Sequence, residues 1–377
     1  MMIRSFLPVG QGAFYCEQFG SIYGGEKINV IYDCGSSTGV DLVETQIREC
    51  FQKGETIHAV FLSHLDQDHI NGLPYLLKYC RVEKIFFPLI TKSDSLYIRL
   101  SNIIKSGKED SFLNDFINNP YIAFNELELN YTPHLYKVST NEDEYNNVDA
   151  VPIRSGENVG NIIFGDKWNE FNEWLFVPYN FRHTDRINEL QDNFVKIFGK
   201  KMNNDELYRI WNEGGDSERK KVKEAYRKVT GSFNPNSMTL YSGVHSRRVT
   251  QQVYCGKCQH FLCNNMYNRK PSACLYTGDY DASKDENWDA LFDAYKDYWD
   301  SIGCLQIPHH GSRYSYNNRF ADMDVFFVIS AGTDNRYRHP HSMVIRDLLF
   351  HNHFPYIVTE RKMSEIHFRV DVSGIIL

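Results

Sequence analysis

Apolar and polar positions along the chain change their period several times, and each change marks an expected element. From residue 2 to residue 33, three short β-rich runs are separated by glycine-containing turns, which predicts an antiparallel meander. Residues 40–50 then carry apolar positions at helical spacing, residues 57–62 form an apolar run typical of a buried strand, and residues 70–79 return to helical spacing. The chain therefore begins as a meander and continues as alternating helices and strands.

The same alternation continues towards the C-terminus. Strands are expected at residues 84–87, 237–241, 273–276, 304–307 and 325–329, and helices at residues 95–105, 288–298 and 342–350. Between residues 185 and 228, about three charge-rich stretches with helical spacing follow one another without a strand signal, which indicates an inserted helical block. We predict one main α/β (α+β) domain in which helices cover two mixed sheets.

A dense polar turn follows the expected strand at residues 57–62. Its ligand-type residues are His64, Asp66, Asp68 and His69. Alternate residues of an extended segment point the same way, so His64, Asp66 and Asp68 converge, and His69 joins them where the chain bends into a helix. Imidazoles and carboxylates at this density suit two neighbouring divalent cations. The alternative is a polar loop whose charges are solvated.

Three later segments place similar side chains just after an expected strand. They are Thr277-Gly278-Asp279, Pro308-His309-His310-Gly311-Ser312 and Asn335-Arg336-Tyr337-Arg338-His339-Pro340-His341. Taken singly, such residues are more often structural. Loops carried by a rigid scaffold commonly hold functional residues, and four such segments in one chain predict that they gather into one metal site at the edge of the sheets.

Composition limits the class of protein without choosing a substrate. The hydrophobic content of 42% supports a sizeable core, and no apolar run is long enough to cross a bilayer. The first eight residues are too short and too polar for a secretory signal, and nine scattered cysteines indicate reduced, buried thiols. We therefore expect a cytoplasmic protein with no membrane partner. The net charge of −7 argues against a nucleic-acid coat over the whole surface, although a local basic face can still bind phosphate.

The motif set resembles the metallo-β-lactamase fold, and within it the ComEC-like branch of hydrolase domains. The resemblance is carried by His64-x-Asp66-x-Asp68-His69, Thr277-Gly278-Asp279, His309-His310-Gly311-Ser312 and Asn335-x-Tyr337-x-His339-Pro340, with weaker matches at Val9-Gly10-Gln11-Gly12, Asp33-Cys34-Gly35 and Asn234-Pro235-Asn236-Ser237. It implies an αββα sandwich of two mixed sheets over residues 1–377. Residues 183–232 and 245–270 then stand as a helical insertion and a cysteine- and histidine-containing insertion.

By this resemblance, two divalent cations would lie where the loops meet. One would be held by His64 and Asp66 and the other by Asp68 and His69, with Asp279 between them; His309 or His310 and His339 would complete the site, supported from behind by Asp33 and Ser312. Asp66 replaces the histidine of the usual turn, and Pro8 and Ala13 stand where the family usually has aspartates. The oxygen ligands favour manganese or magnesium, while the imidazoles keep zinc as an alternative.

The implied reaction is hydrolysis. Two close cations deprotonate a bridging water to hydroxide and neutralise charge on the attacked group. Asp68 would orient this hydroxide and accept its proton, and His339 or Tyr337 would donate to a leaving or non-bridging oxygen.

A phosphodiester bond of DNA or RNA is the leading substrate hypothesis. Arg313, Arg336 and Arg338 lie in or beside the metal motifs, where guanidinium groups suit phosphate, and Asn335 is a further candidate for substrate binding. Ordinary surface arginine is the competing interpretation. The basic stretch at residues 219–228 is better explained as a solvated helix face than as a nucleic-acid contact.

Two other functions remain open at this stage. The same fold accepts small phosphoesters, lactones and thioesters, so a small-molecule hydrolase is the alternative enzyme. The third hypothesis is a non-catalytic zinc-containing scaffold. Its zinc would be held by the cluster Cys255, Cys258, His260 and Cys263, although reduced cysteines that pack in a hairpin explain this cluster better.

Overall fold

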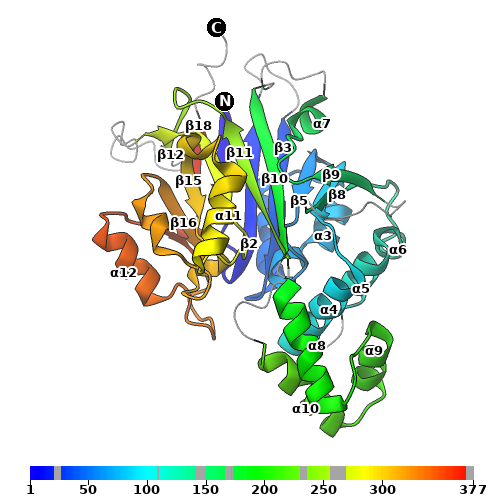
Figure 1. Ribbon diagram of the computed structural model, residues 1–377. Helices are drawn as coiled ribbons and strands as arrows, with labels where there is room; N and C mark the ends of the chain where they lie inside the picture. The colour runs from blue at the N-terminus through cyan, green and yellow to red at the C-terminus, as the bar shows by residue number, and fades with distance from the viewer. Residues whose placement is uncertain are drawn as a thin grey trace.

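Two large sheets face each other in the computed structural model, and helices cover both outer faces (Figure 1). The structure describes residues 1–20, 27–107, 110–140, 150–165, 171, 173–182, 184–229, 236–254 and 269–370. The cluster Cys255, Cys258, His260 and Cys263 lies outside the described residues, as do residues 234 and 235 of the weaker motif.

Among the described residues, the larger sheet has ten strands in the order β13-β12-β18-β1-β2-β3-β5-β7-β8-β9. Their bounds are β1 Met2–Phe6, β2 Gly12–Phe19, β3 Ile28–Ser36, β5 Ala59–Phe61, β7 Lys84–Pro88, β8 His134–Ser139, β9 Val151–Arg154, β12 Thr250–Tyr254, β13 Lys270–Pro271 and β18 Ile366–Val370. The predicted meander is confirmed, because β1, β2 and β3 pair antiparallel. From β3 to β9 the pairing is parallel, so the sheet is mixed.

In the described ranges, the smaller sheet has six strands in the order β10-β11-β14-β15-β16-β17. Their bounds are β10 Trp174–Arg182, β11 Asn236–Val244, β14 Ala273–Tyr276, β15 Ile302–Gln306, β16 Phe326–Ser330 and β17 Tyr356–Val358. The first two pairings are antiparallel and the last three are parallel. A separate two-stranded ribbon joins β4 (Thr56–Ile57) to β6 (Arg81–Val82).

Three hydrophobic clusters separate the four layers. The first lies between the sheets and joins side chains such as Phe61 and Tyr276. The second lies under the helices of the first half, and the third under α11 and α12. These helices are α1 Val40–Cys50, α2 Gln67–Ile70, α3 Leu73–Tyr79, α4 Lys92–Ser106, α5 Ser111–Asn118, α6 Pro120–Glu126, α11 Asp285–Tyr295 and α12 Ser342–Phe350. The short helix α7 Gly160–Phe164 instead contributes Ile163 and Phe164 to the first cluster. The αββα sandwich expected from the sequence is confirmed.

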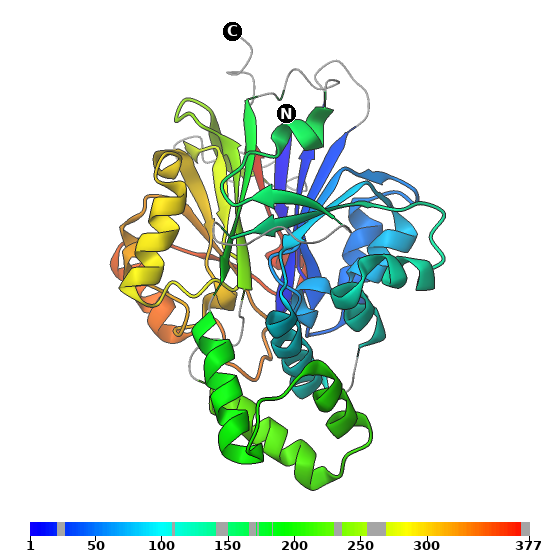
Figure 2. The ribbon, with the colours of Figure 1, turned by 45° about the vertical axis from the view of Figure 1, so that its right-hand side comes forward.

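Three helices follow β10 and extend beyond the sandwich on the side where α4 lies (Figure 2). They are α8 Thr184–Phe198, α9 Asn204–Asn212 and α10 Asp216–Arg227. Together with α4 they bury a fourth cluster that includes Leu100, Phe194 and Tyr226. The helices expected between residues 185 and 228 are therefore present, and the interpretation of residues 183–232 as an insertion stays a prediction.

The described start of the expected insertion at 245–270 belongs to the larger sheet, since β12 pairs with β18 and β13. Among the described residues, no helix combines the length and the apolar character needed to cross a membrane. The cytoplasmic location stays a prediction. The six described cysteines are free thiols, as expected.

A buried ion pair links the two sheets on the inside of the sandwich. Arg4 of β1 and Glu17 of β2 are cross-strand partners, with Arg4 Nε donating to Glu17 Oε1 at 2.8 Å. Ser242 Oγ and Tyr276 Oη of the smaller sheet donate to Glu17 at 2.6 and 2.9 Å, and Arg4 donates to the Ser242 carbonyl at 3.1 Å. Both charged side chains are almost fully buried, so this network fixes how the sheets lie on each other.

Candidate metal centre

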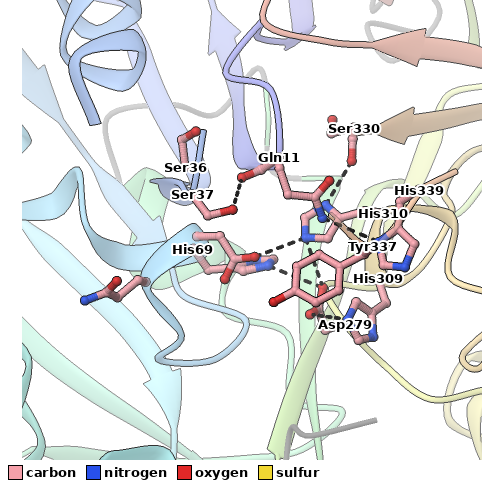
Figure 3. A network of polar contacts seen from close by, with 12 residues as sticks. Gln11, Ser36, Ser37, His69, Asp279, His309, His310, Ser330, Tyr337 and His339 are labelled. Carbon is pink, nitrogen blue, oxygen red and sulfur yellow. Dashed lines mark hydrogen bonds and ion pairs between the residues drawn. The ribbon is translucent and has the colours of Figure 1, made fainter. Parts of the chain in front are cut away.

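The expected ligand segments meet at one edge of the sandwich (Figure 3). His64 and Asp66 lie between β5 and α2, Asp68 and His69 belong to α2, and Asp279 follows β14. His309 and His310 form a short turn after β15, and His339 lies between β16 and α12. Both sheets therefore contribute side chains to the same place.

Asp279 lies at the centre of this cluster. Its Oδ1 is 3.3 Å from His69 Nε2 and 3.9 Å from His310 Nε2. Its Oδ2 is 3.7 Å from His64 Nε2 and 3.5 Å from His309 Nε2. Each carboxylate oxygen thus faces one imidazole from the larger sheet and one from the smaller sheet.

Within the part of the chain that the structure describes, two groups of side chains have ligand atoms close enough to hold a cation. One is His64, Asp68 and His69, the other is His69, Asp279 and His310, and within each the ligand atoms lie within 4.8 Å of one another. Asp68 Oδ2 also lies 3.4 Å from His310 Nε2, which links the groups. Asp66 belongs to neither group, although it is buried and precedes α2 in the same turn. Its role as a ligand stays a prediction.

Hydrogen bonds at Nδ1 leave the Nε2 atoms of two imidazoles available to bind a metal ion. His69 Nδ1 lies 2.8 Å from the Asp33 carboxylate, and His310 Nδ1 lies 2.9 Å from the Ser330 carbonyl oxygen. Because these oxygens accept, each Nδ1 carries the proton and each neutral ring keeps its lone pair on Nε2. Both Nε2 atoms are buried without a hydrogen-bond partner in the described residues. Such a lone pair is what a divalent cation requires, so the residues fit one.

Asp33 and Ser63 form hydrogen bonds with the Nδ1 atoms of His69 and His64. The Ser63 backbone N–H and hydroxyl each donate to Asp33 at 2.7 Å. Because the hydroxyl proton points to Asp33, Ser63 Oγ accepts from His64 Nδ1 at 2.9 Å. His64 Nε2 is then left to face Asp279. Asp33 therefore has the supporting position expected from the sequence, and Ser63 shares it, although the sequence analysis did not single out Ser63.

The clustered charges shift the pKa values in opposite directions. Burial alone would raise the pKa of Asp279, yet the imidazoles of His309, His69 and His64 hold it well below its ordinary value. Burial alone would lower the pKa of His69, yet Asp279 and Asp33 raise it well above its ordinary value. A cation that binds here has to displace a proton from His69, so we expect metal affinity to increase with pH.

Replacing Asp33 with asparagine is expected to weaken metal binding by about 10- to 100-fold, because the charged acceptor that orients His69 is lost. Titration calorimetry of the metal-stripped protein measures this change. Asp94→Asn is the matched control, because the Asp94 carboxylate is equally buried but accepts from Thr91 and Arg182 instead of a histidine. Equal losses of affinity in both variants would contradict the role of Asp33.

The turn before Asp279 has no room for a side chain at Gly278. Gly278 has a φ of +54°, and a Cβ there would lie 2.6 Å from Ser63 Cβ. Gln306 clamps the turn, since its Oε1 accepts from the Thr277 and Gly278 N–H groups at 2.8 Å each. The backbone that aims Asp279 therefore packs directly on the serine that supports the histidines.

Gly278→Ala is expected to abolish stoichiometric metal binding and to lower the melting temperature, because it pushes Ser63 away and strains the turn. Gly54→Ala is the matched control, since Gly54 has a φ of +81° with no atom within 4 Å of the added Cβ. That variant shows the backbone cost alone, about 1–2 kcal/mol. Calorimetric melting measures the loss of stability in both variants, and metal analysis measures the loss of metal. Wild-type metal content in Gly278→Ala would refute the packing argument.

Contacts from α4 and α8 also reach the loops that carry the candidate ligands. Asn102 of α4 accepts from the Gln67 N–H at 3.0 Å and donates to the Leu65 carbonyl at 3.1 Å. Arg186 of α8 forms a buried ion pair with Asp281, two residues after Asp279. Neither residue was expected from the sequence, because each contact joins segments that are distant along the chain.

The remaining predicted residues lie around the cluster. Arg313 stacks on Tyr314 at 4.6 Å and Arg336 on Tyr337 at 4.8 Å, and all four side chains are exposed. Arg338 is also exposed.

Ser312 and Asn335 are used within their own loops. Ser312 is buried, and its Oγ accepts from the Tyr314 N–H at 3.3 Å. The Asn335 amide binds the N–H and the carbonyl of His339 at 2.8 and 2.7 Å. Asn335 therefore orders the loop, and its expected substrate contact stays a prediction.

Part of the chain matches a protein-family model. The model of the Metallo-beta-lactamase superfamily matches residues 18–93, a segment that contains Asp33 and the His64 to His69 turn. No curated protein matches the chain. The match supports the resemblance inferred from the motifs at the level of the superfamily, and the ComEC-like branch stays a prediction.

Several solved structures are similar to the chain at low identity. Unliganded yeast PDE1 is 9% identical, with 98% of this chain and 99% of that chain covered and a TM-score of 0.41. The metallo-beta-lactamase MIM-1 from Novosphingobium pentaromativorans is 11% identical, with 82% and 78% covered and a TM-score of 0.29. A mutant metallo-beta-lactamase from Cronobacter sakazakii is 10% identical, with 92% and 90% covered and a TM-score of 0.30.

Proposed function

We propose that this chain is a metal-dependent hydrolase that cleaves phosphodiester bonds in DNA or RNA with two divalent cations. The observation that carries the proposal is the position of Asp279, whose two oxygens each face an imidazole from each sheet. A carboxylate in this position suits a bridge between two cations. The order of the motifs along the chain supports a place in the ComEC-like branch.

The donor atoms divide between two sites. We assign His64 and His309, which face Asp279 Oδ2, to one cation and His69, His310 and Asp68 to the other, with Asp279 serving both. His69 can serve one cation only, because its Nδ1 is bound to Asp33. Zinc, manganese and magnesium all remain candidates for this mixture of nitrogen and oxygen ligands.

When bound, the cations would lower the pKa of water and neutralise negative charge on the substrate. Asp68 is the more open carboxylate, with 17% of its side chain exposed against 3% for Asp279. It can therefore reach an attacking water and accept its proton. Asp33, Ser63 and Gln306 keep the ligand side chains in place.

The exposed pairs Arg313–Tyr314 and Arg336–Tyr337 support nucleic acid as the substrate. Each pair belongs to a loop that carries a candidate ligand, His309 or His339. Guanidinium groups bind phosphate, and guanidinium and tyrosine planes both stack on unpaired bases. A small apolar substrate would gain little from these groups.

Cleavage assays on two substrates test the proposal. We expect Mn²⁺- or Zn²⁺-dependent cleavage of a labelled single-stranded oligonucleotide and of bis(p-nitrophenyl) phosphate. The double variant Arg313→Ala, Arg336→Ala should lose about 10-fold or more on the oligonucleotide, since each stacking or phosphate contact contributes about 1–3 kcal/mol. It should keep its rate on the small ester.

Arg247→Ala is the control, because Arg247 is exposed and pairs with Asp300. Robust ester hydrolysis without any cleavage of nucleic acid would reject the substrate and favour the small-molecule hydrolase. Failure on both substrates by a fully metal-loaded preparation would reject phosphodiester hydrolysis.

A further inference from the structure

A glutamine from the opposite sheet contacts His339. Gln11 lies in the turn before β2 and is buried, with 4% of its surface exposed. Its Nε2 lies 3.5 Å from His339 Nδ1, and its Oε1 accepts from the Gly332 N–H at 3.4 Å. Figure 3 shows this side chain directed at His339, beside His310.

The orientation of this amide follows from its partners. The Gly332 N–H can only donate, so the amide atom that faces it must be the oxygen. The nitrogen of Gln11 must then face His339, and an amide nitrogen can only donate. His339 Nδ1 is therefore the acceptor, which leaves the proton of a neutral ring on Nε2.

This assignment is the reverse of that of His69 and His310. The Nδ1 atoms of His69 and His310 donate to oxygens, so their Nε2 atoms carry lone pairs. His339 carries a proton where they carry a ligand electron pair. It is also absent from both groups of candidate ligands among the described residues.

The surroundings keep the His339 ring at the metal centre. Its centroid lies 5.6 Å from that of His309 and 6.2 Å from that of His310. Tyr337 stacks on it at 5.6 Å with an interplanar angle of 21°, and Asn335 binds its backbone on both sides. The ring is thus held beside the proposed ligands.

We propose that Gln11 is a positioning residue that keeps His339 as a neutral imidazole with its proton on Nε2. His339 then donates a hydrogen bond to a non-bridging oxygen of the substrate and is not a metal ligand. The inference rests on the proposed hydrolase function. It replaces the expectation that His339 completes a metal shell. A donor already in place stabilises negative charge that develops in the transition state.

The first test measures the protonation of the His339 ring and the metal content of the protein, and it needs no catalytic turnover. Long-range ¹H–¹⁵N spectra of the full chain, with labelled histidine and bound zinc, should show a signal from a neutral ring protonated on Nε2 that disappears in His339→Gln and stays in His353→Gln, whose ring also donates from Nε2, to the Ala321 carbonyl. Metal analysis should find wild-type metal content in His339→Gln and a loss of metal in His310→Gln. A metal-bound His339 Nε2, or a loss of metal in His339→Gln, would overturn the proposal.

The second test changes the partner of His339. In Gln11→Glu the carboxylate accepts, so the His339 proton should move to Nδ1, and kcat on bis(p-nitrophenyl) phosphate should fall about 100-fold with KM nearly unchanged. Gln18→Glu, on the same strand β2 but paired with Asn29, is the control.

An unchanged His339 spectrum in folded, metal-loaded Gln11→Glu would refute the positioning role. Because the spectra and the metal content need no turnover, they decide this inference even if no phosphodiester is cleaved. Failure of the hydrolase proposal and failure of the Gln11 proposal are therefore distinguishable.

Discussion

Replacing Asp279 with asparagine should reduce hydrolysis by about 1,000-fold or more and remove at least one metal ion per chain. The reason is that both carboxylate oxygens face imidazoles from both sheets, so a neutral amide would weaken both proposed sites together. Metal analysis after dialysis and steady-state rates on bis(p-nitrophenyl) phosphate measure the two effects.

Asp293→Asn is the matched control, since Asp293 lies exposed on α11. It should behave as the wild type in both assays. An Asp279→Asn variant that keeps full metal content and full activity would show that the carboxylate does not join two cations.

Replacing Arg4 with methionine is expected to lower the free energy of unfolding by about 3–5 kcal/mol, because Glu17 is left as a buried charge without its cation. The side chains of Arg4 and Glu17 are 0% and 3% exposed, so water cannot replace the lost partner. Urea unfolding of the metal-free protein, followed by circular dichroism, measures the change.

The double variant Arg4→Met, Glu17→Gln should recover part of this loss, because no buried charge remains. Arg247→Met is the comparison at the surface. Its pair with Asp300 is 66% and 79% exposed, so removing it should have little effect on stability. A single Arg4→Met variant as stable as the wild type would contradict the account of the buried pair.

Elements with strong periodicity could be predicted from the sequence, and weak edge strands could not. The expected helices at residues 40–50 and 342–350 match α1 and α12 to the residue, because their apolar positions repeat at helical spacing. β10 was not expected. It contains Pro178 and lies at the edge of its sheet, where a proline is tolerated but weakens the strand pattern.

Some residues of the candidate site could likewise be predicted from the sequence, and others could not. His64, Asp68, Asp279, His309 and His310 could be predicted to gather, because ligand-type residues followed several expected strands. The contacts of Asn102, Gln306 and Gln11 depend on segments far away in the sequence, so their residue types alone gave no signal. The glycines that flank Gln11 marked a turn but did not indicate what its side chain touches.

Because Asp279 lies between imidazoles from both sheets, the proposed metal binding also contributes to the stability of the fold. Ligands at each oxygen come from both sheets, so bound ions would fasten the two halves of the sandwich to each other. At free metal about 100 times the dissociation constant, one such site adds about 2.7 kcal/mol to the folded state. Starving a cell of metal would then expose the chain to proteases as well as slowing its reaction.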